Sequence, residues 1–240
     1  MAHYGYYGAP GSIVLGPDAG ASAIPAVPLD LPKPLFRYGE QSIWSTALLA
    51  NTVNPANTVI RTFSTPIGQT GQNFQNPLSV SETNLKEGGR IPAGVAYDVF
   101  GIALQVLTAT SNEASGTPAQ FNGAVDTAAD IQGLLNILNN TVVSWDFTQT
   151  SVDISPALLV GQGGGAFGAV AQNAAGANSG HMNNGSGNVW LYRKYPVALP
   201  ANSTFGIILR IGNRTAAMPA TDTGLRVVLL GYYKNIIEIG

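Results

Sequence analysis

The stretch VAYDVFGIALQVLT, residues 95–108, is a long apolar run with β-branched residues and no proline, which is typical of a β-strand. Alternate residues of a strand point to opposite faces of its sheet. One face would carry Phe100, Ile102, Leu104 and Val106, and the other Val95, Tyr97, Val99 and Leu107. Because both faces are apolar, we expect the second face to be covered by another layer or by another subunit.

Shorter runs with strand character occur on both sides of this stretch. They are residues 58–64, 141–148, a short run around 152–154, 189–197, 204–211 and 225–233. The cleanest alternation is in 204–211, with Phe205, Ile207, Leu209 and Ile211 on one face and Thr204, Ile208 and Arg210 on the other. The 29 Gly and 15 Pro cluster between the runs, as in a chain with many turns. The sequence therefore predicts a mainly β protein of about eight strands.

One helix is predicted, over residues 127–139. Thr127 is a candidate N-cap, and Asp130 follows it three residues later. The spacing of one apolar helix face is found at Ile131, Leu134, Leu135 and Leu138. Asn139 and Asn140 then favour a left-handed stop.

The first 40 residues differ in composition from the rest of the chain. They are rich in Gly, Ala and Pro and include the run PLDLPKP at 28–34, which favours an extended path over a helix. We interpret residues 1–40 as an extended N-terminal arm, with a disordered tail as the alternative. Residues 41–240 are then a single domain. Met1 to Gly11 lacks the features of a secretory signal, so synthesis in the cytosol is expected.

The chain is 45% apolar but only 10% charged, with 13 acidic and 11 basic residues. An ordinary soluble domain carries roughly 25% charged residues, because its whole exterior meets water. We therefore expect much of this surface to be covered by other copies of the chain. The net charge is −2, and residues 1–32 contain no Lys or Arg, so no direct nucleic-acid binding is expected.

The most conspicuous apparent motif is GGGAFG at 163–168, which has the G-x-G-x-x-G spacing of a dinucleotide site. Such a site also needs an acidic residue about 20 positions further on and parallel βαβ units. Between Asp153 and Asp222 the chain has no acidic residue. A long mobile loop over 161–188 is therefore the preferred interpretation.

Catalytic and metal sites have little support in the sequence. There is no cysteine, and the two histidines, His3 and His181, lie far apart in the predicted arm and loop. Asp146 and Asp153 are the best pair of carboxylates, and we interpret them as surface groups. The sequence thus predicts no catalytic, cofactor-binding or metal residue, no cofactor and no enzymatic activity.

The best basic and aromatic cluster lies near the end of the predicted loop. Arg193 and Lys194 stand between Tyr192 and Tyr195. Two charges cannot supply the several phosphate contacts that useful nucleic-acid affinity requires. A contact between subunits is the preferred interpretation.

The predicted elements describe an eight-stranded antiparallel jelly-roll β-sandwich with one inserted helix and an extended N-terminal arm. The pieces that carry a family pattern are RIPAG at 90–94 before the long strand, the helix at 127–139, LPA at 199–201 before FGI at 205–207, and RVVLLGY at 226–232. In this pattern the chain resembles the jelly-roll major capsid proteins of tailless icosahedral viruses and bacteriophages. Those with an internal membrane and upright jelly rolls are the most similar.

The resemblance implies a structural protein of the virion that assembles through trimeric or pseudo-hexameric capsomers into an icosahedral capsid. It implies homo-oligomer contacts, other capsid or penton proteins as partners, and no cofactor. The arm, with Tyr4, Tyr6 and Tyr7, would run between subunits or along an internal membrane. The alternative is a phage receptor-binding or spike domain, or a lectin-like sandwich.

Overall fold

The computed structural model describes residues 35–52, 54–121, 128–147, 150–157, 160, 167–172, 178–183, 190–191, 194–214 and 220–237. The chain divides into two units, residues 37–235 and the terminal segments 1–36 with 236–240. In the second unit, only the strand residues 35–36 and 236–237 are described. The fold is therefore that of residues 37–235.

The described residues form twelve strands and one helix. In chain order these are β1 Leu35–Leu49, β2 Val59–Thr62, β3 Val95–Ser111, β4 Gln120–Phe121, α1 Ala128–Asn139, β5 Thr141–Phe147, β6 Thr150–Pro156, β7 Phe167–Gln172, β8 Asn178–Asn183, β9 Trp190–Leu191, β10 Val197–Leu199, β11 Phe205–Ile211 and β12 Thr223–Ile237. The predictions of a mainly β chain and of a helix near 127–139 are confirmed.

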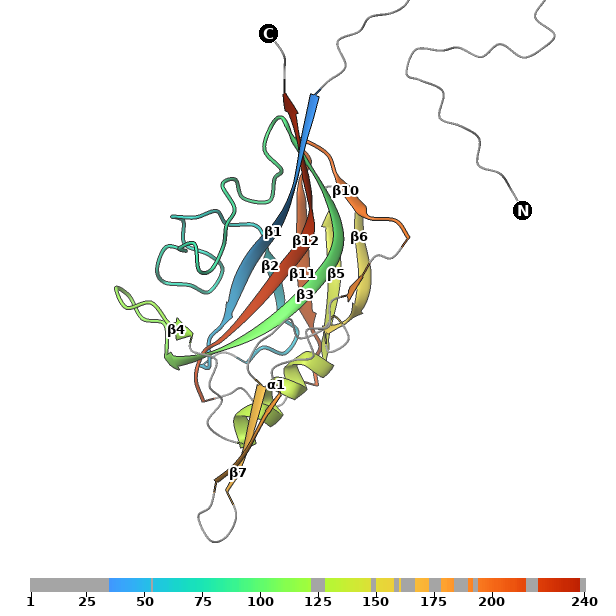
Figure 1. Ribbon diagram of the computed structural model, residues 1–240. Helices are drawn as coiled ribbons and strands as arrows, with labels where there is room; N and C mark the ends of the chain where they lie inside the picture. The colour runs from blue at the N-terminus through green and yellow to red at the C-terminus, as the bar shows by residue number, and fades with distance from the viewer. Residues whose placement is uncertain are drawn as a thin grey trace, which may run out of the picture. The chain divides into compact units, whose positions relative to one another are not determined.

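The strands form two antiparallel sheets and a separate hairpin of β7 and β8 (Figure 1). One sheet has the order β1-β12-β3-β10, and β4 and β9 also pair with β3. The other sheet has the order β2-β11-β5-β6. The pairs are nested along the chain: β1 pairs with β12, β2 with β11, β3 with β10, and β5 with β6. The first sheet is called the six-stranded sheet and the second the four-stranded sheet.

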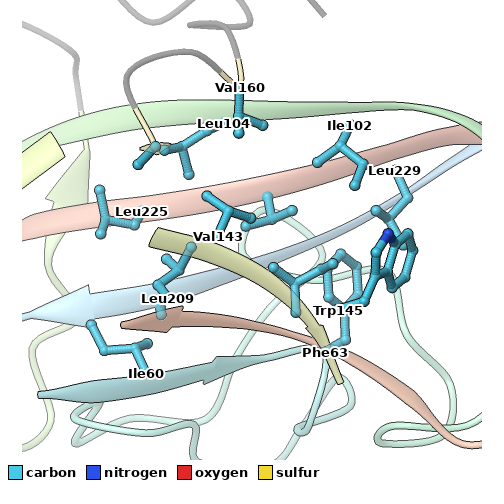
Figure 2. Packing of buried hydrophobic residues seen from close by; sticks show 14 of the residues in the cluster. Ile60, Phe63, Ile102, Leu104, Val143, Trp145, Val160, Leu209, Leu225 and Leu229 are labelled. Carbon is cyan, nitrogen blue, oxygen red and sulfur yellow. The ribbon is translucent and has the colours of Figure 1, made fainter. Parts of the chain in front are cut away.

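The core lies between these two sheets, as a β-sandwich requires. Figure 2 shows Ile102, Leu104, Leu225 and Leu229 from the six-stranded sheet, together with Ile60, Val143, Trp145 and Leu209 from the four-stranded sheet. Helix α1 adds Leu134, Ile137 and Leu138 to the same cluster. The helix ends where the Thr141 hydroxyl donates a hydrogen bond to the Ile137 carbonyl over 2.6 Å, and β5 begins at once.

A β-bulge in β3 changes which residues of this strand face the core. Leu230 of β12 is opposite Gly101, but Gly231 is opposite Val99, so Phe100 is an extra residue. The bulge shifts the alternation by one position. Tyr97 and Val99, before the bulge, are 2% and 0% exposed, and they share the core with the apolar residues after it.

The division of residues 95–108 into two apolar faces is therefore wrong as predicted. The bulge places residues from both predicted faces on the core side, namely Tyr97, Val99, Ile102, Leu104 and Val106, whereas Phe100 lies on the outer side. Tyr97 and Val99 are buried in the core, and Val95 packs against its margin.

Glycine is required at position 231, opposite the bulge. A Cβ atom there would lie 2.6 Å from Cε1 of Tyr97 and would also overlap the backbone oxygen of Asp98. The Tyr97 ring thus packs directly on the β12 backbone. Its hydroxyl lies within hydrogen-bonding distance of the Gln41 and Leu229 carbonyl oxygens.

The segment 63–90 covers part of the outer side of the six-stranded sheet. Its Phe74 and Leu78 form a second small core with Leu48 of β1, and Phe121 packs against it. The Arg226 guanidinium, on the outer side of β12, donates hydrogen bonds to Thr46 Oγ1 and to the Ser81 carbonyl.

Three sequence predictions need correction. The run 189–197 is not one strand, since β9 and β10 are separate short strands. The predicted loop 161–188 contains the hairpin of β7 and β8. No strand was predicted at 35–49, where β1 lies, and the last residues of the predicted arm are the beginning of this strand. The rest of the arm, residues 1–34, lies outside the described residues.

Candidate functional site

The two predicted carboxylates lie on the outer side of the four-stranded sheet, and each forms an ion pair. Asp146 of β5 accepts a hydrogen bond from Nη1 of Arg61 over 2.6 Å. Asp153 of β6 accepts one from Nη1 of Arg210 over 3.0 Å and another from the Ser144 hydroxyl over 2.6 Å. Carboxylates held in this way are surface ion pairs, as the sequence indicated.

These ion pairs also shield an apolar side chain. Ile208 of β11 is opposite Arg61 on one side and Ser144 on the other, so it points to the outer side of the sheet. It is nevertheless only 4% exposed. The long arginine side chains cover apolar surface with their methylene groups while the charged ends meet water. The outer side of the four-stranded sheet therefore carries two ion pairs above a buried Ile208, and Val59 is its exposed aliphatic residue, at 47%.

The glycine-rich motif does not form a phosphate site in the described part of the chain. Gly163 to Ala166 lie outside the described residues, and Phe167 and Gly168 begin β7. A dinucleotide site requires a helix after the glycines, and β7 is a strand.

Only some of the remaining predicted residues lie in the described part of the chain. His181 lies in β8 opposite Ala169, and His3 is outside the described residues. Lys194 places Nζ 5.3 Å from the centroid of the Tyr195 ring, whereas Tyr192 and Arg193 are not described. Among the described residues, no group of three or more His, Asp or Glu side chains is placed to hold a metal ion. No described helix has the length and hydropathy needed to span a membrane.

An exposed apolar surface lies on the part of the six-stranded sheet that segment 63–90 leaves open. We call this surface the outer patch, and its residues are Phe100, Leu191, Val228, Leu230 and Tyr232. Leu191 and Tyr232 are 49% and 43% exposed. Exposed apolar surface of this kind is typical of contact sites on soluble proteins.

The register explains how distant residues meet in the outer patch. Leu191 of β9 and Leu230 of β12 are both opposite Gly101 of β3, so the glycine lies between two apolar side chains. The bulged Phe100 packs its ring on that of Tyr232, with centroids 5.1 Å apart. The outer patch could not be predicted from the sequence because its parts come from three strands. The apolar run at 226–232 was its only signal.

A second feature is a cleft of about 500 Å³ at the end of the sandwich where β1 begins and β12 ends. We call it the end cleft. Its floor is apolar, with Ile43, Leu85, Ile91, Val95, Tyr97 and Tyr233. Its rim carries Glu40, Lys86, Glu87 and Arg90, and the side chains of Gln41, Asn84 and Asn235. The volume is within the range of ligand and peptide sites.

The two similar turns of the sequence lie side by side at this end. Gly94 and Asn202 both have a left-handed φ, of 77° and 62°, and each turn closes with a hydrogen bond to a proline carbonyl, of Pro92 or Pro200. The Asn202 amide donates to the Ile91 carbonyl over 3.0 Å. The segments 91–94 and 199–202 thus enter β3 and β11 through similar turns.

No protein-family model matches the chain, and neither a curated protein nor a solved structure is significantly similar to it. The fold, the outer patch and the end cleft are the observations from which a function can be inferred.

Proposed function

We propose that this chain is a structural capsid protein of a tailless icosahedral virus or bacteriophage, with a jelly-roll fold and without enzymatic activity. It assembles through trimeric or pseudo-hexameric capsomers into the shell of the virion. The partners are other copies of the chain, together with further capsid or penton proteins.

The nested strand pairing supports the jelly-roll fold. Eight strands, namely β1, β2, β3, β5, β6, β10, β11 and β12, can be counted from one to eight along the chain. The two sheet orders then become 1-8-3-6 and 2-7-4-5. A long antiparallel hairpin that is rolled into two sheets pairs its first strand with its last and its fourth with its fifth, which is the jelly-roll arrangement of capsid and lectin domains.

The outer patch is the observation that carries the assembly proposal. It combines exposed apolar side chains with a chain that has only 10% charged residues. Burial of apolar surface stabilises association by roughly 25 cal/mol per Å². A second copy of the chain that covers Leu191 and Tyr232 would remove from water the two most exposed apolar side chains of this sheet face.

The proposal also includes contacts made by the N-terminal arm. Its first 32 residues carry no basic side chain, so we propose that it contacts neighbouring subunits or the internal membrane rather than the genome. The tyrosines at positions 4, 6 and 7 suit a lipid headgroup layer. Liposome co-sedimentation that does not change when residues 1–11 are deleted would exclude the lipid contact.

The end cleft favours a second candidate, a receptor-binding or lectin-like sandwich. Tyr233 with the amide of Asn235 offers an aromatic ring and a polar group, which are common sugar contacts. A glycan array tests this candidate directly. Glycan binding that is lost in Asn235→Ala, by a protein that stays monomeric, would favour it over the capsid proposal.

Negative-stain microscopy of the purified protein tests the capsid proposal. We expect trimers, hexamer-like rings or closed shells. Single particles of one chain at every concentration would contradict it.

A further inference from the structure

Among the described residues, the segment 82–84 covers only one half of the edge strand β1. At the covered half, the Thr46 amide donates to the Glu82 carbonyl over 2.8 Å, and the Asn84 amide donates to the Trp44 carbonyl over 3.3 Å. The Asn84 side chain accepts from the Trp44 amide and donates to the Ser42 carbonyl. The even-numbered residues of β1 thus direct their backbone groups away from β12. From Ser42 onward, residues 82–84 form hydrogen bonds with these groups.

The other half of the β1 edge, residues 37–41, lies beyond the segment 82–84. In an antiparallel strand, alternate residues direct both the N–H and the C=O to the same side. Tyr38 and Glu40 continue the even-numbered set, so their backbone groups point away from β12. Outside the strand ladders, no backbone hydrogen bond among the described residues involves Tyr38 or Glu40. An edge with open donors and acceptors is a template for another strand.

The end cleft lies beside this open edge, with Glu40 and Gln41 in its lining. A strand that pairs with residues 37–41 would alternate its side chains between the two sides of the sheet. Those on the core side would enter the cleft, over the apolar floor formed by Ile43 and Val95. Open backbone groups next to a pocket for alternate side chains are the elements of recognition by strand addition.

The arm contains one segment with the chemistry that such an edge requires. The run GSIVLG, residues 11–16, lies between Pro10 and Pro17 and has neither a charge nor a proline. Two consecutive β-branched residues, Ile13 and Val14, favour an extended strand. From residue 25 to residue 34, by contrast, four prolines interrupt the chain and would remove ladder donors.

We propose that residues 37–41 of β1 receive Ser12–Leu15 from the arm of a second copy as an added strand. Ile13 and Leu15 then enter the end cleft, and Val14 lies on the same side of the sheet as Glu40. The chain between Leu15 and Leu35 can extend over roughly 66 Å, which is enough to reach a neighbour. This inference rests on the proposed self-assembly and names the strand that links the copies.

Cysteine cross-linking tests the pairing, because the natural chain has no cysteine. Glu40→Cys and Val14→Cys are introduced into separate copies of the full-length chain, which are co-expressed and oxidised. We expect a disulfide-linked species of twice 24.9 kDa that disappears on reduction. Tyr6→Cys and Ala21→Cys, each co-expressed with Glu40→Cys, are the controls in the same arm and should cross-link at background level. Equal cross-linking of either control would overturn the inference.

Hydrogen exchange gives a second readout that does not depend on a disulfide. We expect the Tyr38 and Glu40 amides of the full-length chain to exchange at least about tenfold more slowly than in Val14→Pro, which cannot complete the ladder. Ala21→Pro is the matched control in the arm and should keep the protection. Equal exchange rates in all three proteins would contradict the pairing.

Microscopy and cross-linking of the same samples together distinguish this inference from the proposed function. Shells in the microscope without the Val14 to Glu40 cross-link would overturn the strand addition and leave the capsid proposal standing. The cross-link in a protein that stops at a dimer would support the strand addition and contradict the capsid proposal. A cross-link that forms only within one chain carrying both cysteines would overturn the assignment to a second copy.

Discussion

The outer sides of the two sheets have opposite chemistry. On the four-stranded sheet, the pairs Arg61–Asp146 and Arg210–Asp153 lie across the strands and shield Ile208. On the six-stranded sheet, the part that segment 63–90 leaves open exposes Leu191 and Tyr232, with the ion pair of Lys234 and Asp98 at its margin. The outer side of the four-stranded sheet thus carries ion pairs, whereas the open part of the six-stranded sheet presents a cluster of apolar side chains to water.

This difference shows where the small number of charges has been placed. Two of the three ion pairs of the described residues lie on the four-stranded sheet, where they complete a solvated surface. The outer patch has no comparable cover. A contact with other copies through the six-stranded sheet would bury the apolar side chains of the outer patch and leave the ion pairs of the four-stranded sheet in water.

The largest expected effect is a loss of assembly when a charge enters the outer patch. Leu191→Asp should shift the native mass to that of a single chain, 24.9 kDa, because a carboxylate cannot be buried without a partner. Val59→Asp is the matched control, since Val59 is an aliphatic residue of similar exposure, 47% against 49%, on the outer side of the four-stranded sheet. Light scattering measures both masses. Equal loss of assembly in both variants would remove the distinction between the two sides.

A second large effect is expected at the bulge that places Phe100 on the outer side. Gly231→Ala should lower the free energy of unfolding by about 3 kcal/mol, because its methyl group would overlap the Tyr97 ring and the Asp98 backbone. Urea denaturation followed by tryptophan fluorescence measures the change. Gly206→Ala in β11 is the control, since its nearest neighbour is 3.5 Å away and ordinary contact suffices. A change below about 1 kcal/mol in Gly231→Ala would contradict the bulge geometry.

A small effect is expected from the ion pairs of the four-stranded sheet. Asp146→Asn should cost at most about 1 kcal/mol of stability, because the Arg61 side chain is largely exposed. The assembled mass should not change. Loss of shells or capsomers in Asp146→Asn, with the fold intact by circular dichroism, would show that the four-stranded side also makes contacts.

The smallest effect concerns the segment that covers the other half of the six-stranded sheet. Burial raises the pKa of the Glu82 carboxyl, but hydrogen bonds from Ser79 and Ser81 outweigh it and hold the pKa below the usual 4.5 of a glutamate. The charged form is therefore favoured by folding, and its stabilisation is present above pH 4.5 and lost as the pH falls through the lower folded value. Glu82→Gln should make the unfolding midpoint less sensitive to pH below 4.5. An unchanged slope would contradict this role.

The regular elements could be predicted from the sequence where one signal dominates. Residues 204–211 alternate apolar and polar groups with one exception, and they form β11 as expected. The helix could be predicted from its cap and apolar spacing, and its bounds differ by one residue from those of α1. The carboxylates at 146 and 153 lie on the solvated side, as alternation indicated.

The features that define the candidate site depend on pairing between strands, which the sequence does not reveal by itself. The bulge at Phe100 is a property of how β3 pairs with β12, so β3 was assigned two apolar faces. β1 has apolar residues on both sides, since Leu48 faces the second core and Leu49 the first. The end cleft arises where β1, β3, β12 and the segment 84–92 meet.

The native mass of the full-length protein, measured by light scattering over a range of concentrations, distinguishes self-assembly from a monomeric state. We expect a mass several times 24.9 kDa at every concentration above the association threshold, with trimers or their multiples as the main species. A single mass of 24.9 kDa up to the highest concentration would contradict it, since the outer patch and the open edge of β1 would then have no partner copy.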